Sequence, residues 1–227
     1  MTAFARLALL AGFLACQATS AWAVIEAEGV SIDESVVING QKLVLNGYGV
    51  RKRGYFKTEL TALYLPQRTN SAEVVYKTNA PRYVRQTILR DLPAAVASRF
   101  FIREFTMDAT EAEAKQLVTE LGAIGGLYGN INRINKGDVV ELFWNPGQGM
   151  NGKYNGKWFD ERYITNPLWW AVYMRGFVGP NVAESFRNGI LGLNGSAASN
   201  GSAAANGSNA SASTGPSIVT IDPPKAR

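Results

Sequence analysis

The sequence predicts an α+β fold in which antiparallel strands form one sheet and helices cover one of its faces. Three observations lead to this prediction. Strand-type segments with tight-turn signals fill the chain between residues 36 and 89, and apolar residues at helical spacing begin after Pro93. Further strand and helix patterns then follow up to about residue 191. This order is typical of an α+β domain and not of regularly alternating βαβ units.

The first 23 residues have the pattern of a secretory signal. A short basic region with Arg6 precedes an apolar stretch over residues 7–14, and Ala-Trp-Ala at 21–23 suits cleavage before Val24. The apolar stretch is shorter than the about 20 residues that span a bilayer. We therefore expect an exported, periplasmic or secreted protein with no transmembrane segment. The alternative is a lipoprotein that is anchored through Cys16, because residues 13–16 loosely resemble a lipoprotein site.

The C-terminal residues 192–227 form a low-complexity tail. Residues 192–215 are almost wholly Asn, Gly, Ser and Ala, which cannot bury enough apolar area to offset chain entropy, so we expect disorder. Residues 217–227 would suit an edge strand, but a free tail is the expectation. What remains, residues 24–191, is the size of one domain.

Local signals predict each element of the first half. Asn39-Gly40 favours a tight hairpin turn between strands at 36–38 and 42–45. The strand that follows residues 47–53 has apolar residues at both odd and even positions over 60–65, which indicates burial on both faces. A short helix capped by Ser71 and a strand over 83–89 complete this half.

The second half begins with a helix over residues 93–105. A second helix starts with a capping box from Thr110 to Glu113 and ends near Gly122, and a glycine-rich loop follows over 125–129. We then expect a strand over 138–144 and a meander over 150–159 with two Asn-Gly turns. The last two helices are one with Asn166 as cap and Pro167 in its first turn, and one capped by Asn181.

Composition excludes several classes of function. The chain has no histidine and one cysteine, so histidine-dependent triads, His/Cys zinc sites and histidine-bound haem are impossible. Removal of Arg6 with the signal leaves 22 basic against 18 acidic residues, which is a weak charge for a nucleic-acid-binding protein. No phosphate-binding glycine loop or metal-binding loop is present. We therefore expect no cofactor, no metal and no nucleic-acid partner, and the oligomeric state stays open.

The most informative stretch is residues 46–66. Three basic residues, 51–53, close one strand, and the next strand is strongly apolar. If the two strands are neighbours, Arg51 lies at the rim of an apolar cleft, where its planar guanidinium suits a carboxylate, an enolate or a phenolate. Tyr64 would add a hydroxyl to such a cleft. In the alternative, the basic residues form a solvated turn and Tyr64 is a core residue.

Several motifs make the chain similar to the bacterial chalcone-isomerase-like family. They are Gly47-x-Gly-x-Arg51-Lys, Phe56-Lys57 and Ala62-Leu-Tyr-Leu-Pro66, with Asn166-Pro-Leu-Trp-Trp170, Gly179-Pro180 and Ile190-Leu-Gly192 near the end. The resemblance covers about residues 46–192. It implies the chalcone isomerase fold, an open-faced β-sandwich with an antiparallel sheet and helices layered on one face.

Two functions are known on that fold. The plant enzyme is a cofactor-free intramolecular lyase, and plastid relatives bind fatty acids with an arginine and a tyrosine on the carboxylate. Arg51 matches the shared arginine. Five residues before Tyr64, where the enzyme has threonine and the binders have tyrosine, this chain has Glu59. Glu59 would pair with Arg51 and weaken its attraction for anions, act as a base toward a neutral or cationic partner, or point away from the cleft.

The leading prediction is an exported protein that binds a small apolar or amphipathic molecule, such as a fatty acid, without catalysis. Arg51, Glu59 and Tyr64 are its predicted ligand-binding residues, in a closed cavity lined partly by residues 55–65 and the helix around 100–105, with Arg51 at its polar end. One alternative is a lyase or isomerase of the chalcone isomerase type with Arg51 as the catalytic residue. The other is a protein-interaction scaffold, which would have an exposed aromatic patch in place of a cavity.

Overall fold

The computed structural model describes residues 24–160, 162–194 and 217–219. The predicted signal, the alternative anchor at Cys16 and most of the predicted tail lie outside these residues. Export therefore stays a prediction from the sequence.

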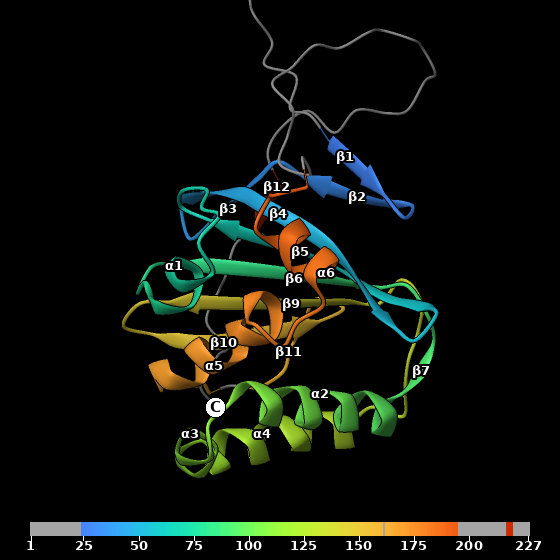
Figure 1. Ribbon diagram of the computed structural model, residues 1–227, viewed down its shortest axis with the longest axis vertical. Coiled ribbons are helices and arrows are strands. Elements are labelled where there is room, and N and C mark those ends of the chain that lie inside the picture. The colour runs from blue at the N-terminus through green and yellow to red at the C-terminus, as the bar shows by residue number, and fades with distance from the viewer. Residues whose placement is uncertain (1–23, 161, 195–216, 220–227) are drawn as a thin grey trace, which may run out of the picture.

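One eight-stranded sheet forms the centre of the molecule (Figure 1). Its order is β11-β10-β9-β6-β5-β4-β3-β12, and every neighbouring pair is antiparallel except β12 with β3. A β1–β2 hairpin and a short β7–β8 pair stand apart from it. The strands are β1 (Val24–Ala27), β2 (Val30–Asp33), β3 (Ser35–Ile38), β4 (Gln41–Arg53), β5 (Phe56–Leu65), β6 (Arg82–Ile88), β7 (Leu92–Pro93), β8 (Arg133–Ile134), β9 (Val139–Asn145), β10 (Gly149–Tyr154), β11 (Lys157–Trp158) and β12 (Ser217–Val219).

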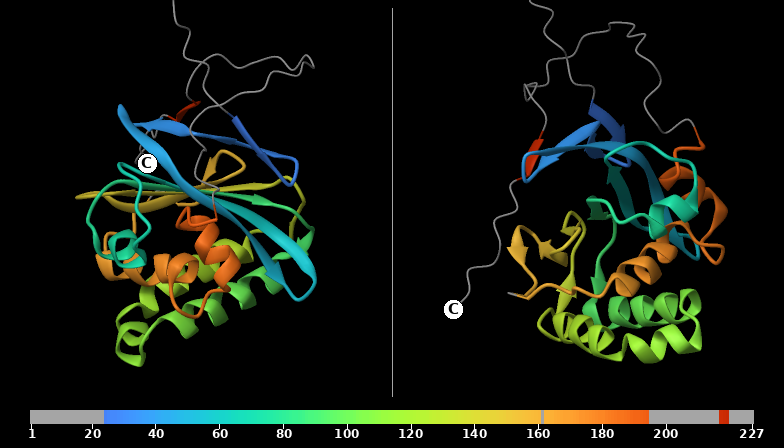
Figure 2. Two further views of the ribbon diagram at one scale, coloured as in Figure 1. Left: turned by 45° about the horizontal axis from the view of Figure 1, so that its top comes forward. Right: turned by 90° about the vertical axis from the view of Figure 1, so that its left-hand side faces the viewer.

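The helices gather on one side of the curved sheet, as Figure 2 shows. They are α1 (Ala72–Lys77), α2 (Ala94–Asp108), α3 (Glu111–Gln116), α4 (Val118–Gly129), α5 (Pro167–Val178) and α6 (Glu184–Ile190). The larger apolar core lies between the sheet and these helices and includes the buried Trp169 and Trp170. A second core lies on the other face of β3, β4 and β5, where Ile32 of β2 packs.

The α+β prediction is confirmed. Its hairpin turn and two of its helix caps form as expected, because each depends only on nearby residues. Asn39 and Gly40 take positive φ angles of 49° and 75° in the turn between β3 and β4. The Ser71 hydroxyl accepts a hydrogen bond from the Val74 amide and caps α1. The Asn166 side chain accepts one from the Leu168 amide and caps α5. Each signal needs only a few neighbouring residues, so the sequence alone specifies it.

The predicted loop over residues 125–129 is wrong, since helix α4 runs from Val118 to Gly129. Gly122, which was expected to end a helix, lies inside α4, and the capping-box helix ends earlier as α3. A Cβ atom at Gly122 or Gly126 would meet nothing within 4 Å, so packing does not require glycine there. Packing of the apolar side chains Leu121 and Ile124 against the core keeps α4 helical despite its low helix propensity.

Three other local expectations are corrected. Asn151-Gly152 lies inside strand β10 and is not a turn. The Asn181 side chain caps no helix, because α6 begins after Ala183; its amide donates instead to the Met107 carbonyl at the end of α2, at 2.8 Å. The free tail is wrong for Ser217–Val219, which pair with β3 as strand β12.

A β-bulge at Asn46 decides which way the end of β4 faces. Leu45 pairs with Tyr64 and Gly47 with Leu63, so Asn46 is one extra residue in β4. Leu43 and Leu45 before it belong to the second core, whereas Gly47 after it packs against the α6 backbone. The Asn46 side chain is fixed there, because its amide donates to the Ile190 carbonyl at 2.8 Å. The bulge therefore turns the later odd-numbered residues of β4 toward the helices.

The glycines of α4 give a first testable prediction. We expect the double substitution Gly122→Ala/Gly126→Ala to stabilise the protein by about 1 to 2 kcal/mol, because alanine restricts the unfolded chain and no atom obstructs its methyl group. Urea unfolding followed by circular dichroism measures the change. A loss of stability would contradict the helical assignment of this segment.

Candidate functional site

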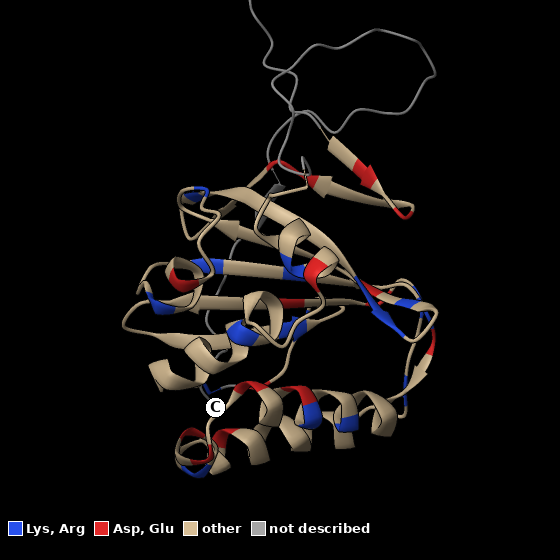
Figure 3. Ribbon diagram, viewed as in Figure 1, with Lys and Arg blue, Asp and Glu red and all other residues tan. Residues whose placement is uncertain are grey.

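A cavity of about 160 Å³ lies between the sheet and the helices α2, α4 and α5. This space would hold roughly ten water molecules. Most of its wall is apolar, and charged side chains gather where the end of β4 approaches α2, where basic and acidic segments meet in Figure 3. The apolar lining includes Leu92, Phe100, Phe101, Phe105, Ile124, Leu127, Val140, Leu142, Val172 and Phe177.

Arg51 lies at the charged end of this cavity with a 13% exposed side chain. Its Nε donates to Glu59 Oε1 at 2.9 Å, and its Nη2 donates to the Gly176 carbonyl of α5 at 2.7 Å. The guanidinium carbon lies 4.3 Å from the ring centroid of Phe186, which α6 supplies. Strand, helix and ring contacts thus fix the guanidinium in one position.

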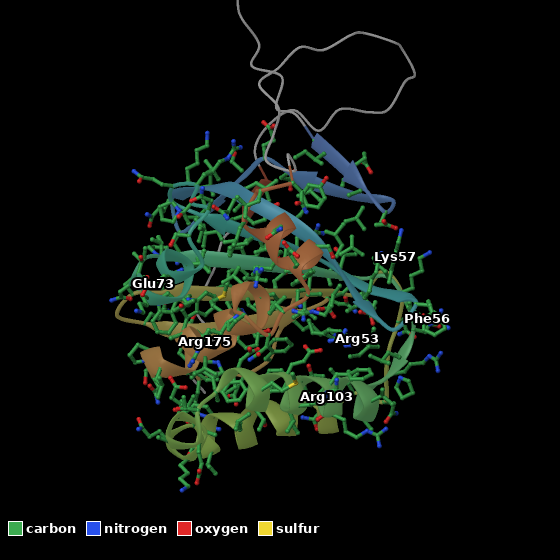
Figure 4. The ribbon with its side chains drawn as sticks, in the orientation of Figure 1. Arg53, Phe56, Lys57, Glu73, Arg103 and Arg175 are labelled. Carbon is green, nitrogen blue, oxygen red and sulfur yellow. The ribbon has the colours of Figure 1, made fainter. Side chains whose placement is uncertain are left out.

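Arg53 follows two residues later on the same face of β4 and joins the same cluster. Its Nη1 donates to Glu59 Oε2 at 3.2 Å, and its Nη2 donates to Glu104 Oε1 of α2 at 2.9 Å. Glu104 Oε2 also lies 3.5 Å from Nη1 of Arg51. Figure 4 shows Arg53 between β4 and α2, whereas Phe56 and Lys57 lie at the outer end of the hairpin. The result is a quartet of two arginines and two glutamates, which we call the charge quartet (Arg51, Arg53, Glu59 and Glu104).

Glu59 is ionised in this environment. Burial opposes its charge, but the charges of Arg51 and Arg53 and their hydrogen bonds outweigh that cost and hold the pKa of Glu59 below its usual value. Gln86 Nε2 adds a hydrogen bond to Glu59 Oε1 at 3.3 Å. The pKa of Arg53 is raised, although burial works against it, because Glu59 and Glu104 stabilise its charge.

Two phenols line the cavity within electrostatic reach of the quartet. Burial, together with the charges of Glu59 and Glu104, raises the pKa of Tyr128 on α4 to about 12. Burial is also the main reason why the pKa of Tyr173 on α5 lies well above its usual value. Both phenols are therefore protonated at neutral pH. In the part of the chain that the structure describes, neither hydroxyl forms a hydrogen bond to protein, so both keep a free donor.

The structure brings two of the three predicted site residues together and separates the third. Arg51 and Glu59 are paired opposite each other on β4 and β5, so their side chains share the helix-facing side of the sheet. Tyr64 is 1% exposed in the second core, on the other face of the sheet, and is not part of the cavity wall. Positions 59 and 64 differ by five, an odd number, which places them on opposite faces of one strand. The parity of β5 could have revealed this from the sequence.

Sequence reasoning missed Glu104, Tyr128 and Tyr173. Glu104 lies within the helical pattern of α2 and carries no signal that points to Arg53. Tyr128 was assigned to a loop, because the neighbouring glycines suggested one. Tyr173 follows the tryptophan pair of α5 and looks like another core aromatic residue. Tertiary packing alone brings these three residues to one end of the cavity.

A second hollow, of about 250 Å³, lies outside the quartet between α2 and the start of α6. Arg51, Glu104, Asp108 and Gly176 line both this hollow and the main cavity. Burial raises the pKa of Asp108 above its usual value, against a hydrogen bond from Asn181. The quartet thus stands between the inner cavity and the protein surface on this side.

Among residues 24–160, 162–194 and 217–219, no three acidic or cysteine side chains are arranged to hold a metal ion. No helix in the same ranges is long and apolar enough to cross a membrane.

Comparisons with known proteins concern the family and the fold of this chain. A family model described as chalcone isomerase-like matches residues 24–192. The search of curated proteins found no match. Among solved structures, the crystal structure of an Arabidopsis thaliana fatty-acid binding protein is similar, with a TM-score of 0.62 and 13% sequence identity. The likeness covers 74% of this chain and 96% of that one. At this identity it concerns the fold.

Proposed function

Because this chain belongs to the chalcone isomerase-like family, whose model spans residues 24–192, we propose that it binds one small amphipathic molecule without chemically changing it. The apolar part of the ligand occupies the cavity between the sheet and α2, α4 and α5. Its polar head lies at the charge quartet. The observation that carries this proposal is a mostly apolar cavity with the charge quartet gathered where β4 approaches α2.

The arrangement of Arg51 favours binding over ring closure. A lyase of the chalcone isomerase type needs a guanidinium that is free to stabilise a phenolate or an enolate. Arg51 already donates to Glu59 and to the Gly176 carbonyl, and the two charges of the Arg51–Glu59 pair cancel. Absorbance loss of a chalcone on mixing, abolished by Arg51→Ala, would support the lyase instead.

The scaffold alternative has less support. It predicts an exposed aromatic patch, for which Trp169 and Trp170 were the candidates, but these side chains are 0% and 2% exposed and belong to the core. They pack in the main core, Trp169 against Phe105 and Trp170 against Trp144, with ring centroids 4.9 Å and 5.7 Å apart. A filled interior would also be expected of a scaffold, whereas this interior holds the cavity.

A pair of substitutions on β9 tests the proposal. Val140 lines the cavity, and its neighbour Val139 does not, because adjacent residues of a strand face opposite sides. We expect Val140→Phe to fill the cavity and lower the affinity for the neutral fluorescent dye N-phenyl-1-naphthylamine at least tenfold. Val139→Phe, the matched control, should bind the dye as the unchanged protein does.

Fluorescence titration measures these affinities, and mass spectrometry of lipid extracts from the purified protein identifies any ligand that copurifies. Failure of the unchanged protein to bind the dye, together with an extract that holds no lipid, would overturn the proposal. Equal loss of binding in the two valine variants would show that the dye does not occupy this cavity.

A further inference from the structure

The charge quartet has no net charge to offer an anionic ligand. Two guanidinium groups and two carboxylates lie in mutual contact, at distances of 2.9 to 3.5 Å. Both glutamates line the cavity beside the arginines, so an incoming carboxylate would meet negative charge as well as positive. Arg90 and Asp108 also line the cavity, one of each sign, so the charged side chains of the lining remain balanced.

Several donors of the two arginines are already bound to the protein. Arg51 uses Nε and Nη2 on Glu59 and Gly176, and Arg53 uses both of its terminal nitrogens on Thr58, Glu59 and Glu104. The Nε of Arg53 has no partner among the described residues, but it is buried from solvent and the Phe100 ring lies 4.8 Å from the guanidinium. The N–H groups of Arg51 that stay free are on Nη1 and Nη2, and Nη1 lies 3.5 Å from Glu104 Oε2, so a carboxylate head that accepts from them would lie beside a carboxylate of the protein.

Other polar groups of the wall remain free for a ligand. The hydroxyls of Tyr128 and Tyr173 keep their protons to donate, as described above. Glu104, with a 32% exposed side chain, has carboxylate lone pairs that the arginines do not fill. A hydroxyl head group can accept from a phenol and donate to a carboxylate at the same time, and it brings no charge into the apolar wall.

We propose that this site selects an uncharged amphiphile with a hydroxyl head group, such as a long-chain alcohol, over a fatty acid. The inference rests on the proposed function, because it needs the cavity to hold a ligand. It infers the class of that ligand from the charge balance of the site, because Glu59 and Glu104 neutralise the two arginines. Fatty-acid binding, the example that the sequence suggested, becomes the competing outcome.

Three ligands of one chain length test this selectivity. Decan-1-ol, methyl decanoate and decanoic acid are each titrated against the bound dye at pH 7. We expect the alcohol to bind at least tenfold more tightly than the ionised acid and more tightly than the ester, which has no proton to donate. Tighter binding of the acid than of the alcohol would overturn this inference and leave the proposed function standing. Absence of binding by the dye and by all three ligands would overturn both.

Two variants test the physical cause. Glu104→Gln removes one negative charge and leaves both arginines, so we expect the ratio of alcohol to acid affinity to fall at least tenfold. Glu73→Gln is the matched control, because Glu73 lies on α1 and is 63% exposed, away from the quartet in Figure 4, and the ratio should not change. Tyr128→Phe removes a donor that the alcohol and the ester can both use, so it should weaken both ligands. An unchanged affinity ratio in Glu104→Gln would contradict the charge argument.

Discussion

Replacing Gly47 with alanine is expected to destabilise the protein by about 3 kcal/mol, because the strand and helix backbones leave no room for a methyl group. A Cβ at Gly47 would lie 2.2 Å from the Gly189 carbonyl oxygen and 2.7 Å from that of Ile190. Both neighbours are backbone atoms of α6, so they cannot turn aside as a side chain would. The helix itself would have to move away from β4.

That movement would also reach the site. Helix α6 carries Phe186, whose ring supports the Arg51 guanidinium, so Gly47→Ala should lower dye affinity as well as stability. Urea unfolding and dye titration measure the two effects. Gly122→Ala is the matched control, because the same methyl group meets open space there and should stabilise the protein. Equal stability changes at the two positions would contradict the close packing of α6 on β4.

Replacing Arg51 with methionine is expected to cost about 3 kcal/mol at pH 7, because it leaves Glu59 buried with only Arg53 as a cationic partner. The variant also leaves the Gly176 carbonyl without its donor. Methionine fills much of the space of the arginine stem, so lost packing contributes less than lost charge. Urea unfolding at a series of pH values measures the cost.

The pH dependence of this loss of stability distinguishes the electrostatic role of Arg51 from its packing role. In the unchanged protein the folded-state pKa of Glu59 is lowered, so its contribution to stability is present above its unfolded pKa and is lost as the pH falls through the folded value. In Arg51→Met the pKa of Glu59 should rise, so the cost of the substitution should shrink below about pH 4.5 as Glu59 takes up a proton. A pH-independent cost would contradict the electrostatic role.

A double substitution gives the control. Arg51→Met/Glu59→Gln removes both members of the pair, so it should be less destabilised at pH 7 than Arg51→Met alone, and its stability should depend less on pH. If the two substitutions simply add, Arg51 and Glu59 are not coupled. Such additivity would also remove the electrostatic basis of the proposed head-group selectivity.

Several elements of this fold were predictable from signals that act within one turn of chain, although the same kind of signal failed at Asn151-Gly152 and at Asn181. The hairpin at Asn39-Gly40 and the caps at Ser71 and Asn166 are of this kind. Helix α4 was not predictable, because its glycines favour a loop locally and only packing against the core overrides them. For the same reason Tyr128, which α4 carries into the cavity, could not be assigned to the site.

For the site, the sequence by itself determined that Arg51 is in a basic run that closes one strand and that Glu59 lies in the apolar strand that follows. It also determined that the chain has no histidine with which to do chemistry. Only the tertiary structure decided that Arg51 faces the cavity, because the single extra residue at Asn46 exchanges the two faces of β4. Successive side chains of a strand point to opposite faces of the sheet, so a one-residue bulge reverses the face on which every later side chain lies. Helix packing then decided the rest, because it brings Glu104 and the two phenols to that arginine from positions that no local pattern connects.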